Sequence, residues 1–311
     1  MINKNSKIFL TGDKGLVGSA IYRKLVELGY KNILTFKKKK LDLRDQSKVS
    51  NFIKKQKPQV VIIAAGRVGG ILANSTYPGS FIYDNLMIAI NLINSSYENG
   101  IKKLIYLGSS CIYPSNIKIK IKETDLLKSY LEKTNEGYAI AKIAGIKLCE
   151  YYNKQYKLNY LSLMPTNIYG PNDNYDSQNS HFLPALIKKI HNAKIKNKKS
   201  ITLWGNGKSR RELLYVEDLA DSVIFFMNKK TKHSLINIGS GKDMSIKDYA
   251  LKLMKILNYK TKIKLDQSKP NGTYKKTLNV SLASSYGWKY KINLNEGLKK
   301  TYEDFLVKFI T

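Results

Sequence analysis

An α/β fold built on a doubly wound parallel sheet is predicted by three observations. Short apolar runs alternate with amphipathic helical segments through the first 170 or so residues. The connections between these segments are short, which favours parallel strands with helices on both faces. A glycine-rich turn joins the first apolar run to the first helical segment, the arrangement that opens many doubly wound folds.

The first strand–turn–helix unit is the most specific local signal. Residues 7–11 are predicted to form a buried strand, and residues 19–28 an amphipathic helix. Gly12, Gly15 and Gly18 lie between them, with the spacing G-x-x-G-x-x-G rather than G-x-G-x-x-G. Glycines let a backbone turn tightly and approach a pyrophosphate at the positive end of a helix. A glycine triplet alone is often an ordinary turn, but this context predicts a dinucleotide cradle and a Rossmann-type sheet.

The end of the second predicted strand, residues 32–36, suggests which dinucleotide binds. Four consecutive lysines, residues 37–40, follow this strand, and no acidic residue appears before Asp42. An acidic residue here holds the ribose hydroxyls of NAD, whereas cations suit a 2′-phosphate. We therefore expect NADP, with Lys14 and Lys38 as phosphate contacts. The alternative is that a lysine-rich chain places lysines everywhere.

The later elements follow the same alternation. Strands are expected at residues 60–64, 103–108 and 159–163, and long helices at 81–99 and 135–156. From about residue 172 the alternation of strand and helix segments becomes less regular and the polar loops lengthen. We therefore expect a nucleotide-binding domain over 1–171 and a smaller α/β substrate-binding lobe over 172–311. Residues 212–240 are expected to return to the nucleotide-binding domain. Three connections are predicted in the second half: a basic loop at 192–200 and turns at 239–241 and 269–272.

Tyr138 and Lys142 indicate hydride chemistry. Their i, i+4 spacing on a helix puts the phenol and the ammonium on one face. A nearby cation stabilises a phenolate, so we expect the pKa of Tyr138 to fall. Ser109, at the end of the strand at 103–108, has a hydroxyl that can hold a substrate carbonyl against this phenol. Tyr-x-x-x-Lys alone is a weak motif, but after a dinucleotide cradle it predicts an oxidoreductase.

Composition fits a cytoplasmic enzyme. The chain has 311 residues, of which 43% are hydrophobic, enough for one large core or for one core and a smaller lobe. No apolar run approaches the roughly 20 residues that span a bilayer, and no signal peptide opens the chain. Cys111 and Cys149 have neither disulfide-framework nor metal-site spacing. We therefore expect no membrane partner, no metal and a reducing compartment.

The formal net charge of +31 raises the question of a nucleic-acid partner. The excess is mostly lysine and is spread over both halves of the sequence. No basic motif interleaved with aromatic residues appears. Biased lysine usage explains this charge better than nucleic-acid binding, and attraction of a polyanionic substrate such as a nucleotide sugar is a secondary benefit.

A chain of motifs in order resembles the extended short-chain dehydrogenase/reductase family over essentially the whole length. The most specific of them are AGRVGGI at 65–71, GSSCIYP at 108–114, TNEGYAIAK at 134–142 and MPTNIYGP at 164–171. Asn-Ser-His at 179–181, Trp-Gly-x-Gly at 204–207 and RRELL at 210–214 continue the pattern. Within the family, the chain is similar to enzymes that act on GDP-4-keto-6-deoxysugars.

The resemblance implies roles for five catalytic residues. Ser109, Tyr138 and Lys142 would form the reductase triad, with Lys142 also holding the nicotinamide ribose. Cys111 and His181 match a pair that moves protons at C3 and C5 of the sugar. Carbons beside a 4-ketone have acidified C–H bonds, so a thiolate and an imidazole could abstract and return protons there. The alternatives are a small buried cysteine and a helix-capping or surface histidine.

The resemblance also implies binding residues. Cofactor contacts are expected from the glycine-rich turn, the region after the second strand, the third strand end and the fifth strand end: Gly12, Asp13, Lys14, Gly15, Leu16, Val17, Gly18, Lys38, Asp42, Leu43, Ala64, Ala65, Lys142, Pro165, Thr166, Asn167 and Ile168. Substrate contacts are expected from Asn167, His181, Lys189, Trp204, Arg211 and Asn271. Trp204 stacks on the nucleotide or fills core. Lysine at 14 and 189 and asparagine at 271 depart from the arginines and the aspartate expected there, and lysine cannot reproduce a bidentate arginine clamp on phosphate.

The expected activity is NADPH-dependent 3,5-epimerisation of a GDP-4-keto-6-deoxyhexose followed by reduction of its 4-ketone. The alternative is a C4-reductase of another GDP-4-keto sugar, such as a heptose, with little or no epimerisation. A UDP-sugar 4-epimerase is disfavoured by Cys111 and by the basic end of the second strand. Relatives of this kind pair through the two long helices, so the resemblance also implies a homodimer.

Overall fold

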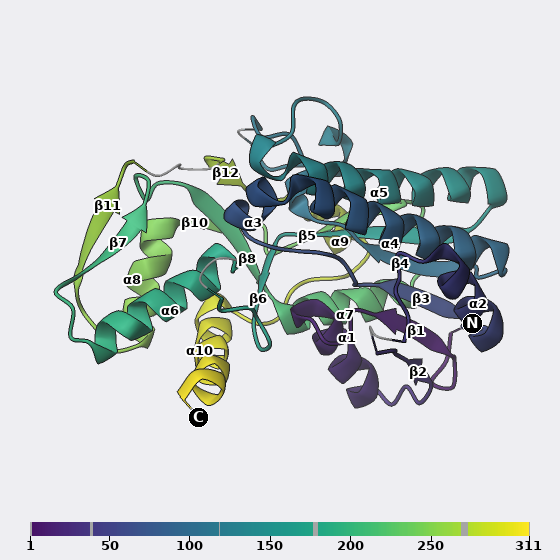
Figure 1. Ribbon diagram of the computed structural model, residues 1–311, viewed down its shortest axis with the longest axis horizontal. Helices are drawn as coiled ribbons and strands as arrows, with labels where there is room; N and C mark the ends of the chain where they lie inside the picture. Colours follow the sequence, from purple (N-terminus) through teal and green to yellow (C-terminus); the bar gives the residue numbers. More distant parts are fainter. Residues whose placement is uncertain (1, 38–39, 118, 177–179, 269–272, 311) are drawn as a thin grey trace.

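A six-stranded parallel sheet lies at the centre of the larger part of the structure (Figure 1). The computed structural model describes residues 2–37, 40–117, 119–176, 180–268 and 273–310. The strand order of the sheet is β2-β1-β3-β4-β5-β9, and every neighbouring pair is parallel. The strands are β1 (Ile8–Thr11), β2 (Ile33–Leu34), β3 (Val60–Ile63), β4 (Lys103–Leu107), β5 (Asn159–Pro165) and β9 (Leu235–Ile238). The predicted doubly wound parallel sheet is confirmed.

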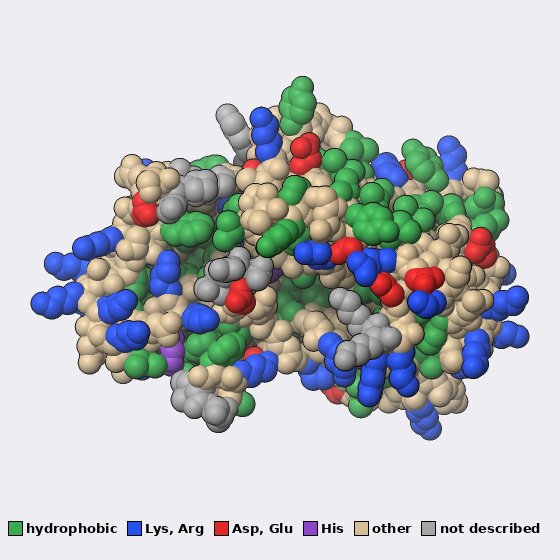
Figure 2. Space-filling model, viewed as in Figure 1, with side chains coloured by type: hydrophobic (Ala, Val, Ile, Leu, Met, Phe, Trp, Pro, Cys, Tyr) green, Lys and Arg blue, Asp and Glu red, His purple; other side chains and the backbone are tan. Residues whose placement is uncertain are grey.

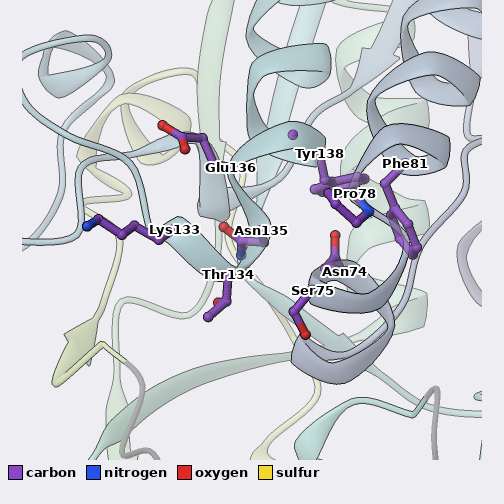
Figure 3. A pocket seen from close by; sticks show the side chains of 10 residues that line it. Asn74, Ser75, Pro78, Phe81, Lys133, Thr134, Asn135, Glu136 and Tyr138 are labelled. Carbon is purple, nitrogen blue, oxygen red and sulfur yellow. The ribbon is translucent and has the colours of Figure 1, made fainter.

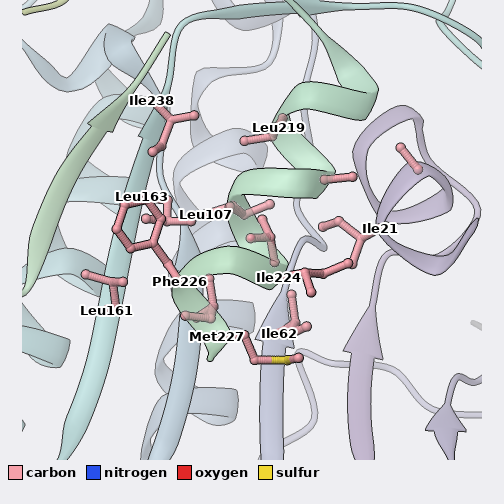
Figure 4. Packing of buried hydrophobic residues seen from close by; sticks show 14 of the residues in the cluster. Ile21, Ile62, Leu107, Leu161, Leu163, Leu219, Ile224, Phe226, Met227 and Ile238 are labelled. Carbon is pink, nitrogen blue, oxygen red and sulfur yellow. The ribbon is translucent and has the colours of Figure 1, made fainter. Parts of the chain in front are cut away.

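Helices cover both faces of this sheet. The helices α1 (Leu16–Glu27) and α7 (Val216–Met227) lie on one face, and α2 (Gln46–Gln56), α4 (Pro78–Glu98) and α5 (Glu136–Tyr156) lie on the other. Successive strand residues enter opposite cores: Ile8 and Leu10 face α1 and α7, whereas Phe9 faces the other side. Figure 4 shows the first of these cores. Burial on both faces explains why the strands are continuous apolar runs.

A second group of elements has a core of its own. The strand β8 (Arg210–Tyr215) pairs with β6 (Asn167–Tyr169), β10 (Asp243–Ser245) and β12 (Lys275–Lys276), while β7 (Ser200–Trp204) pairs with β11 (Lys262–Asp266). Three helices pack against these strands: α6 (Phe182–Ile195), α8 (Ile246–Ile256) and α10 (Leu294–Ile310). The chain returns to the large sheet through α7, β9 and the short helix α9 (Ser281–Ser285).

Several sequence-based expectations differ from the structure. The first helix begins at Leu16, not Ser19, because Leu16 and Val17 already pack against the core. The basic loop expected at 192–200 is wrong at both ends, since α6 continues to Ile195 and buries Ala193, and β7 begins at Ser200. The second strand is limited to Ile33–Leu34. The turn expected at 269–272 lies outside the described residues.

One buried carboxylate, that of Glu212 on β8, joins segments from both parts of the structure. Its Oε2 accepts a hydrogen bond from the backbone N–H of Leu278 at 2.6 Å, and its Oε1 accepts one from Gly241 at 2.7 Å. A Cβ at Gly239 would come within 2.1 Å of Oε1, so the turn after β9 requires glycine there. Burial raises the pKa of Glu212 to about 7, and the backbone N–H bonds act in the opposite direction.

Glu212→Gln should therefore destabilise the protein. The glutamine side chain has one acceptor oxygen in place of two, and its NH₂ group is a donor. The backbone N–H of Leu278 or of Gly241 would therefore face another donor and lose its hydrogen bond. An unsatisfied buried group of this kind costs about 1–3 kcal/mol. We expect a loss of that size in the free energy of unfolding, measured by urea titration.

The matched control is Glu217→Gln on α7. Glu217 forms a surface ion pair with Arg23 at 2.6 Å, and such pairs contribute about 0–1 kcal/mol. Equal stability of the two variants would contradict the role assigned to Glu212.

Candidate active site

The glycine-rich turn between β1 and α1 leaves no room for a side chain at Gly12 or Gly18. Gly12 has φ +78°, and a Cβ there would lie 2.8 Å from the backbone of Ala64 and Ala65 at the end of β3. A Cβ at Gly18 would lie 2.0 Å from the carbonyl oxygen of Gly12. The turn thus sits between the carboxyl ends of β1 and β3, where the strand order reverses and α/β sheets bind their ligands.

The charges around this turn fit an anionic ligand. The helix α1 starts directly after Gly15 and has no acidic residue in its first turn, so its positive end is not neutralised from within. Lys14 lies 3.6 Å from Asp13 and keeps 91% of its side chain exposed. Leu16 and Val17 pack on the core and fix the helix start. Together with the glycines, these residues fit the diphosphate of NADP.

The region after β2 contains an ion-pair network. Asp42 accepts hydrogen bonds from the backbone N–H, Nε and Nη2 of Arg44, whose Nη1 donates to Asp84 at 3.0 Å. Asp84 also pairs with Arg67 at 3.0 Å. Asp42 is therefore neutralised by a cation that the sequence analysis did not single out. Leu43 is buried, and its carbonyl accepts from Asn91 at 3.0 Å, while Lys38 lies outside the described residues.

The segment after β5 runs between the two sheets. The backbone N–H of Thr166 donates to Ile238 of β9, and its hydroxyl donates to the carbonyl oxygen of Glu212 on β8. Asn167 donates through Nδ2 to the same oxygen at 3.0 Å. Pro165 is the last residue of β5, and Ile168 packs against the core of the large sheet. Four predicted cofactor contacts thus lie on one fixed stretch of backbone.

Ser109, Cys111, Tyr138 and Lys142 come together at the end of β4. Lys142 Nζ donates to the carbonyl oxygen of Leu107, the last residue of β4, at 2.8 Å. Tyr138 lies one turn earlier on α5 and hydrogen-bonds with Ser109. The short helix η1 (Ser110–Ile112) begins after Ser109, whose Oγ accepts from the backbone N–H of Cys111 at 3.4 Å.

The expected lowering of the Tyr138 pKa is wrong. Burial raises this pKa well above its ordinary range, Cys111 adds to the rise, and only the hydrogen bond with Ser109 opposes it. Lys142 directs its ammonium to Leu107 and lies over the faces of the Tyr106 and Tyr138 rings, 4.9 and 5.7 Å from their centroids. Burial lowers the pKa of Lys142 to about 8. The phenol is therefore protonated at neutral pH.

Cys111 is half-buried and protonated. Burial raises the pKa of its thiol, while the ammonium groups of Lys276 and Lys142 and the hydrogen bond with Ser109 act in the opposite direction. The thiolate expected from the sequence is therefore not the resting form. Two cations nevertheless stand close enough to stabilise a thiolate when one forms.

His181 is placed apart from the other four catalytic candidates. It is the N-cap residue of α6, with extended backbone and no side-chain hydrogen bond to that helix, and the residue is exposed. Desolvation lowers the pKa of His181, which favours the neutral imidazole. Among the described residues, no hydrogen bond links His181 to Ser109, Cys111, Tyr138 or Lys142. A substrate would have to lie between them for all five to act together.

The predicted substrate contacts lie on β7, β8 and α6. Trp204, at the end of β7, is 57% exposed, which excludes it from the core. Lys189 donates to the carbonyl oxygen of Thr202 at 2.7 Å. Arg211 donates to the carbonyl oxygen of Thr273 at 2.7 Å, and burial lowers its pKa. Asn271 lies outside the described residues.

Two residues of this region were missed by the sequence analysis. Lys276 on β12 interacts electrostatically with Cys111, Arg211 and Glu132, and burial lowers its pKa. Glu132 accepts a hydrogen bond from the Thr273 hydroxyl at 2.8 Å and so links the loop before α5 to the loop before β12. The only sequence signal for Lys276 was its place in a lysine pair, which is uninformative in so basic a chain.

The surface charge is dispersed. Figure 2 shows Lys and Arg side chains over both ends of the molecule instead of along one stripe. Among the described residues, no helix has the length and apolar character that crossing a membrane requires.

Comparisons with known proteins agree with this fold. The profile described as the NAD dependent epimerase/dehydratase family matches residues 8–239. A GDP-L-fucose synthase from Sinorhizobium fredii is 47% identical over 300 residues, covering 96% of this chain and 95% of that protein.

Two solved structures are similar over nearly the whole chain. A GDP-6-OMe-4-keto-L-xylo-heptose reductase from C. jejuni has a TM-score of 0.92 at 35% identity, covering 99% of both chains. A GDP-L-fucose synthetase from Naegleria fowleri bound to NADP has a TM-score of 0.90 at 28% identity, covering 100% of this chain and 96% of that one. The protein therefore belongs to the NAD dependent epimerase/dehydratase family, within the extended short-chain dehydrogenases/reductases that its sequence resembles.

Proposed function

We propose that this protein makes GDP-L-fucose from GDP-4-keto-6-deoxy-D-mannose and NADPH, by epimerisation at C3 and C5 followed by reduction of the 4-ketone. The observation that carries the proposal is the position of Cys111 beside Ser109, Tyr138 and Lys142. A reductase alone needs only the last three. The high identity to a GDP-L-fucose synthase over nearly the whole chain supports the same activity.

In the reductive half, NADPH supplies a hydride to C4 when it is bound. Tyr138, which burial keeps protonated, donates its phenolic proton to the C4 oxygen. Ser109 hydrogen-bonds the same oxygen and orients the carbonyl. Lys142 would hold the nicotinamide ribose, and the glycine turn from Gly12 to Gly18 the diphosphate.

In the epimerising half, the ketone acidifies the C–H bonds at C3 and C5. One member of the Cys111–His181 pair removes a proton, leaving an enolate whose oxygen Ser109 and Tyr138 stabilise by hydrogen bonding. The other member returns a proton to the opposite face, which inverts the carbon. A neutral thiol and a neutral imidazole supply the donor and the acceptor for the first inversion. That step leaves a thiolate and an imidazolium, which act as the acceptor and the donor in the second inversion.

The nucleotide end of the substrate would lie on the smaller part of the structure. Arg211, Lys189 and Lys276 offer cations to the diphosphate, and the exposed indole of Trp204 offers a face for the guanine. Asn167 and Asn271 would add polar contacts. This arrangement corresponds to a cofactor-binding domain over 1–171 and a substrate-binding lobe over 172–311, with segments crossing back between them.

We also propose a cytoplasmic homodimer. The long helices α4 and α5 pack together and leave large apolar side chains exposed, among them Tyr83, Ile90, Ile140 and Tyr151. Figure 2 shows hydrophobic side chains over the region of these helices. A second copy would bury such a face. Cys111 and Cys149 are both unpaired thiols, as suits a reducing compartment.

A second candidate is a C4-reductase of a GDP-4-keto-heptose without epimerisation. It is favoured by the likeness to the heptose reductase from C. jejuni. Incubation with GDP-4-keto-6-deoxy-D-mannose and NADPH separates the candidates. GDP-L-fucose as product supports the proposal, whereas reduction with unchanged configuration at C3 and C5 supports the second candidate. No NADPH oxidation overturns the first.

Tyr138→Phe should abolish reduction while leaving proton exchange at C3 and C5 at least partly intact. The variant loses the proton donor for the C4 oxygen, and Ser109 remains to stabilise the enolate. A loss of about 10²–10⁴-fold in the NADPH oxidation rate is expected. Tyr130→Phe is the control, because Tyr130 is 90% exposed. Equal rates for the two variants would contradict the role of Tyr138.

Cys111→Ser should stop product formation before hydride transfer. A serine hydroxyl is a far weaker acid than the thiol and cannot exchange protons with carbon at the same rate. GDP-L-fucose formation should fall by about 10²-fold or more, as followed by chromatography of the sugar nucleotides. Cys149→Ala is the matched control, since Cys149 lies in the core. Formation of GDP-L-fucose at the wild-type rate by Cys111→Ser would refute its epimerase role.

A further inference from the structure

A small pocket opens beside Tyr138, away from the predicted diphosphate contacts. It lies between α3 (Ile71–Thr76), the start of α4 and the start of α5, with a volume of about 290 Å³. Asn74, Pro78, Phe81, Asn135 and Tyr138 line it (Figure 3). This volume is just below the roughly 300–1,000 Å³ typical of small-molecule sites. It suits one sugar ring better than a whole nucleotide.

Asn74 presents an unpartnered acceptor to this pocket. Its Nδ2 donates to the carbonyl oxygens of Gly69 at 2.9 Å and Gly70 at 3.0 Å, which fixes the orientation of the amide. Its Oδ1 consequently points the other way, and Figure 3 shows the tip of the side chain directed towards Pro78 and Tyr138. The residue is only 6% exposed, and Oδ1 has no hydrogen-bond partner among the described residues. Buried acceptors left in this state are rare.

Asn135 supplies a second acceptor of the same kind. It precedes α5 by one residue and makes no side-chain cap to that helix. Its Oδ1 is also buried and lacks a hydrogen-bond partner within the described parts of the chain. Asn135 thus lines the same cavity as Asn74 and has a buried acceptor of its own.

The chemistry of the pocket selects a neutral, hydroxylated ligand. Phe81, Pro78 and the Tyr138 ring give apolar walls, and the charged Lys133 and Glu136 are exposed. Amide oxygens accept hydrogen bonds and cannot donate them, so the ligand must bring donors. A sugar ring has both apolar C–H faces and hydroxyl donors, whereas the ionised diphosphate of a sugar nucleotide has neither.

We infer that Asn74 is a specificity-determining residue for the sugar, and that its Oδ1 accepts a hydrogen bond from a hexose hydroxyl held in this pocket beside Tyr138. The inference rests on the proposed function for the identity of the GDP-sugar. A sugar that lacks this hydroxyl leaves Asn74 unpaired and binds less tightly, because sites built around a hydrogen bond reject analogues without it.

The test is a comparison of GDP-mannose with GDP as ligands of the NADPH-loaded protein, by isothermal titration calorimetry. GDP shares the nucleotide diphosphate but has no sugar. Asn74→Ala should raise the Kd of GDP-mannose about tenfold, which corresponds to about 1.4 kcal/mol. The Kd of GDP should stay within about twofold of the wild-type value. Thr76→Ala on the same helix is the control, because its hydroxyl only bonds to the Leu72 carbonyl oxygen.

A second variant guards against a structural effect, since Asn74→Ala also removes the two bonds to Gly69 and Gly70. Asn135→Ala removes the other acceptor and leaves the bonds to Gly69 and Gly70 intact. It should likewise weaken the binding of GDP-mannose more than the binding of GDP. The inference would be overturned if the Kd values of GDP-mannose and GDP rose equally, or if neither variant changed the Kd of GDP-mannose. If the wild type binds UDP-glucose and UDP but not the GDP ligands, the proposed function fails. The role of Asn74 is then decided by comparing the effect of Asn74→Ala on the Kd of UDP-glucose with its effect on the Kd of UDP.

Discussion

A buried ammonium group determines the geometry of the active site. Lys142 is 5% exposed, and its burial is compensated by a hydrogen bond to the carbonyl oxygen of Leu107, where β4 ends. This bond fixes the rotation and the height of α5 against the sheet. Because Tyr138 lies one helical turn before Lys142, and Ser109 two residues after Leu107, the phenol and the hydroxyl are brought together by the same contact. Cys111 is placed beside them because it lies only four residues after the end of β4.

The substrate side of the site depends on a second buried group. Glu212 holds the turn after β9 and the backbone at Leu278, and its own carbonyl oxygen accepts from Thr166 and Asn167. Its neighbour Arg211 lies beside Lys276 on the paired strand β12. The predicted cofactor segment, the predicted cationic substrate contacts and the edge of the large sheet therefore meet around one residue, Glu212.

Local patterns were enough to predict the parallel sheet, the glycine turn and the Tyr138–Lys142 helix, because each depends on spacing within one segment. Lys276 and Glu132 could not be found in this way, since β12 reaches β8 from more than sixty residues away in sequence. The predicted direction of the shift in the Tyr138 pKa was also wrong. Charge spacing on a helix suggested a fall, but the pKa is governed by burial, which only the packed fold reveals. The roles of the individual site residues remain predictions.

The central claim is that one pocket first exchanges protons at two carbons and then reduces the carbon between them. The most direct measurement is the isotope content of the product formed by the wild-type protein from GDP-4-keto-6-deoxy-D-mannose and NADPH in deuterated water. We predict solvent deuterium at both C3 and C5 of GDP-L-fucose, read by mass spectrometry and NMR. A reduced product without deuterium at either carbon would contradict the claim and leave a C4-reductase alone.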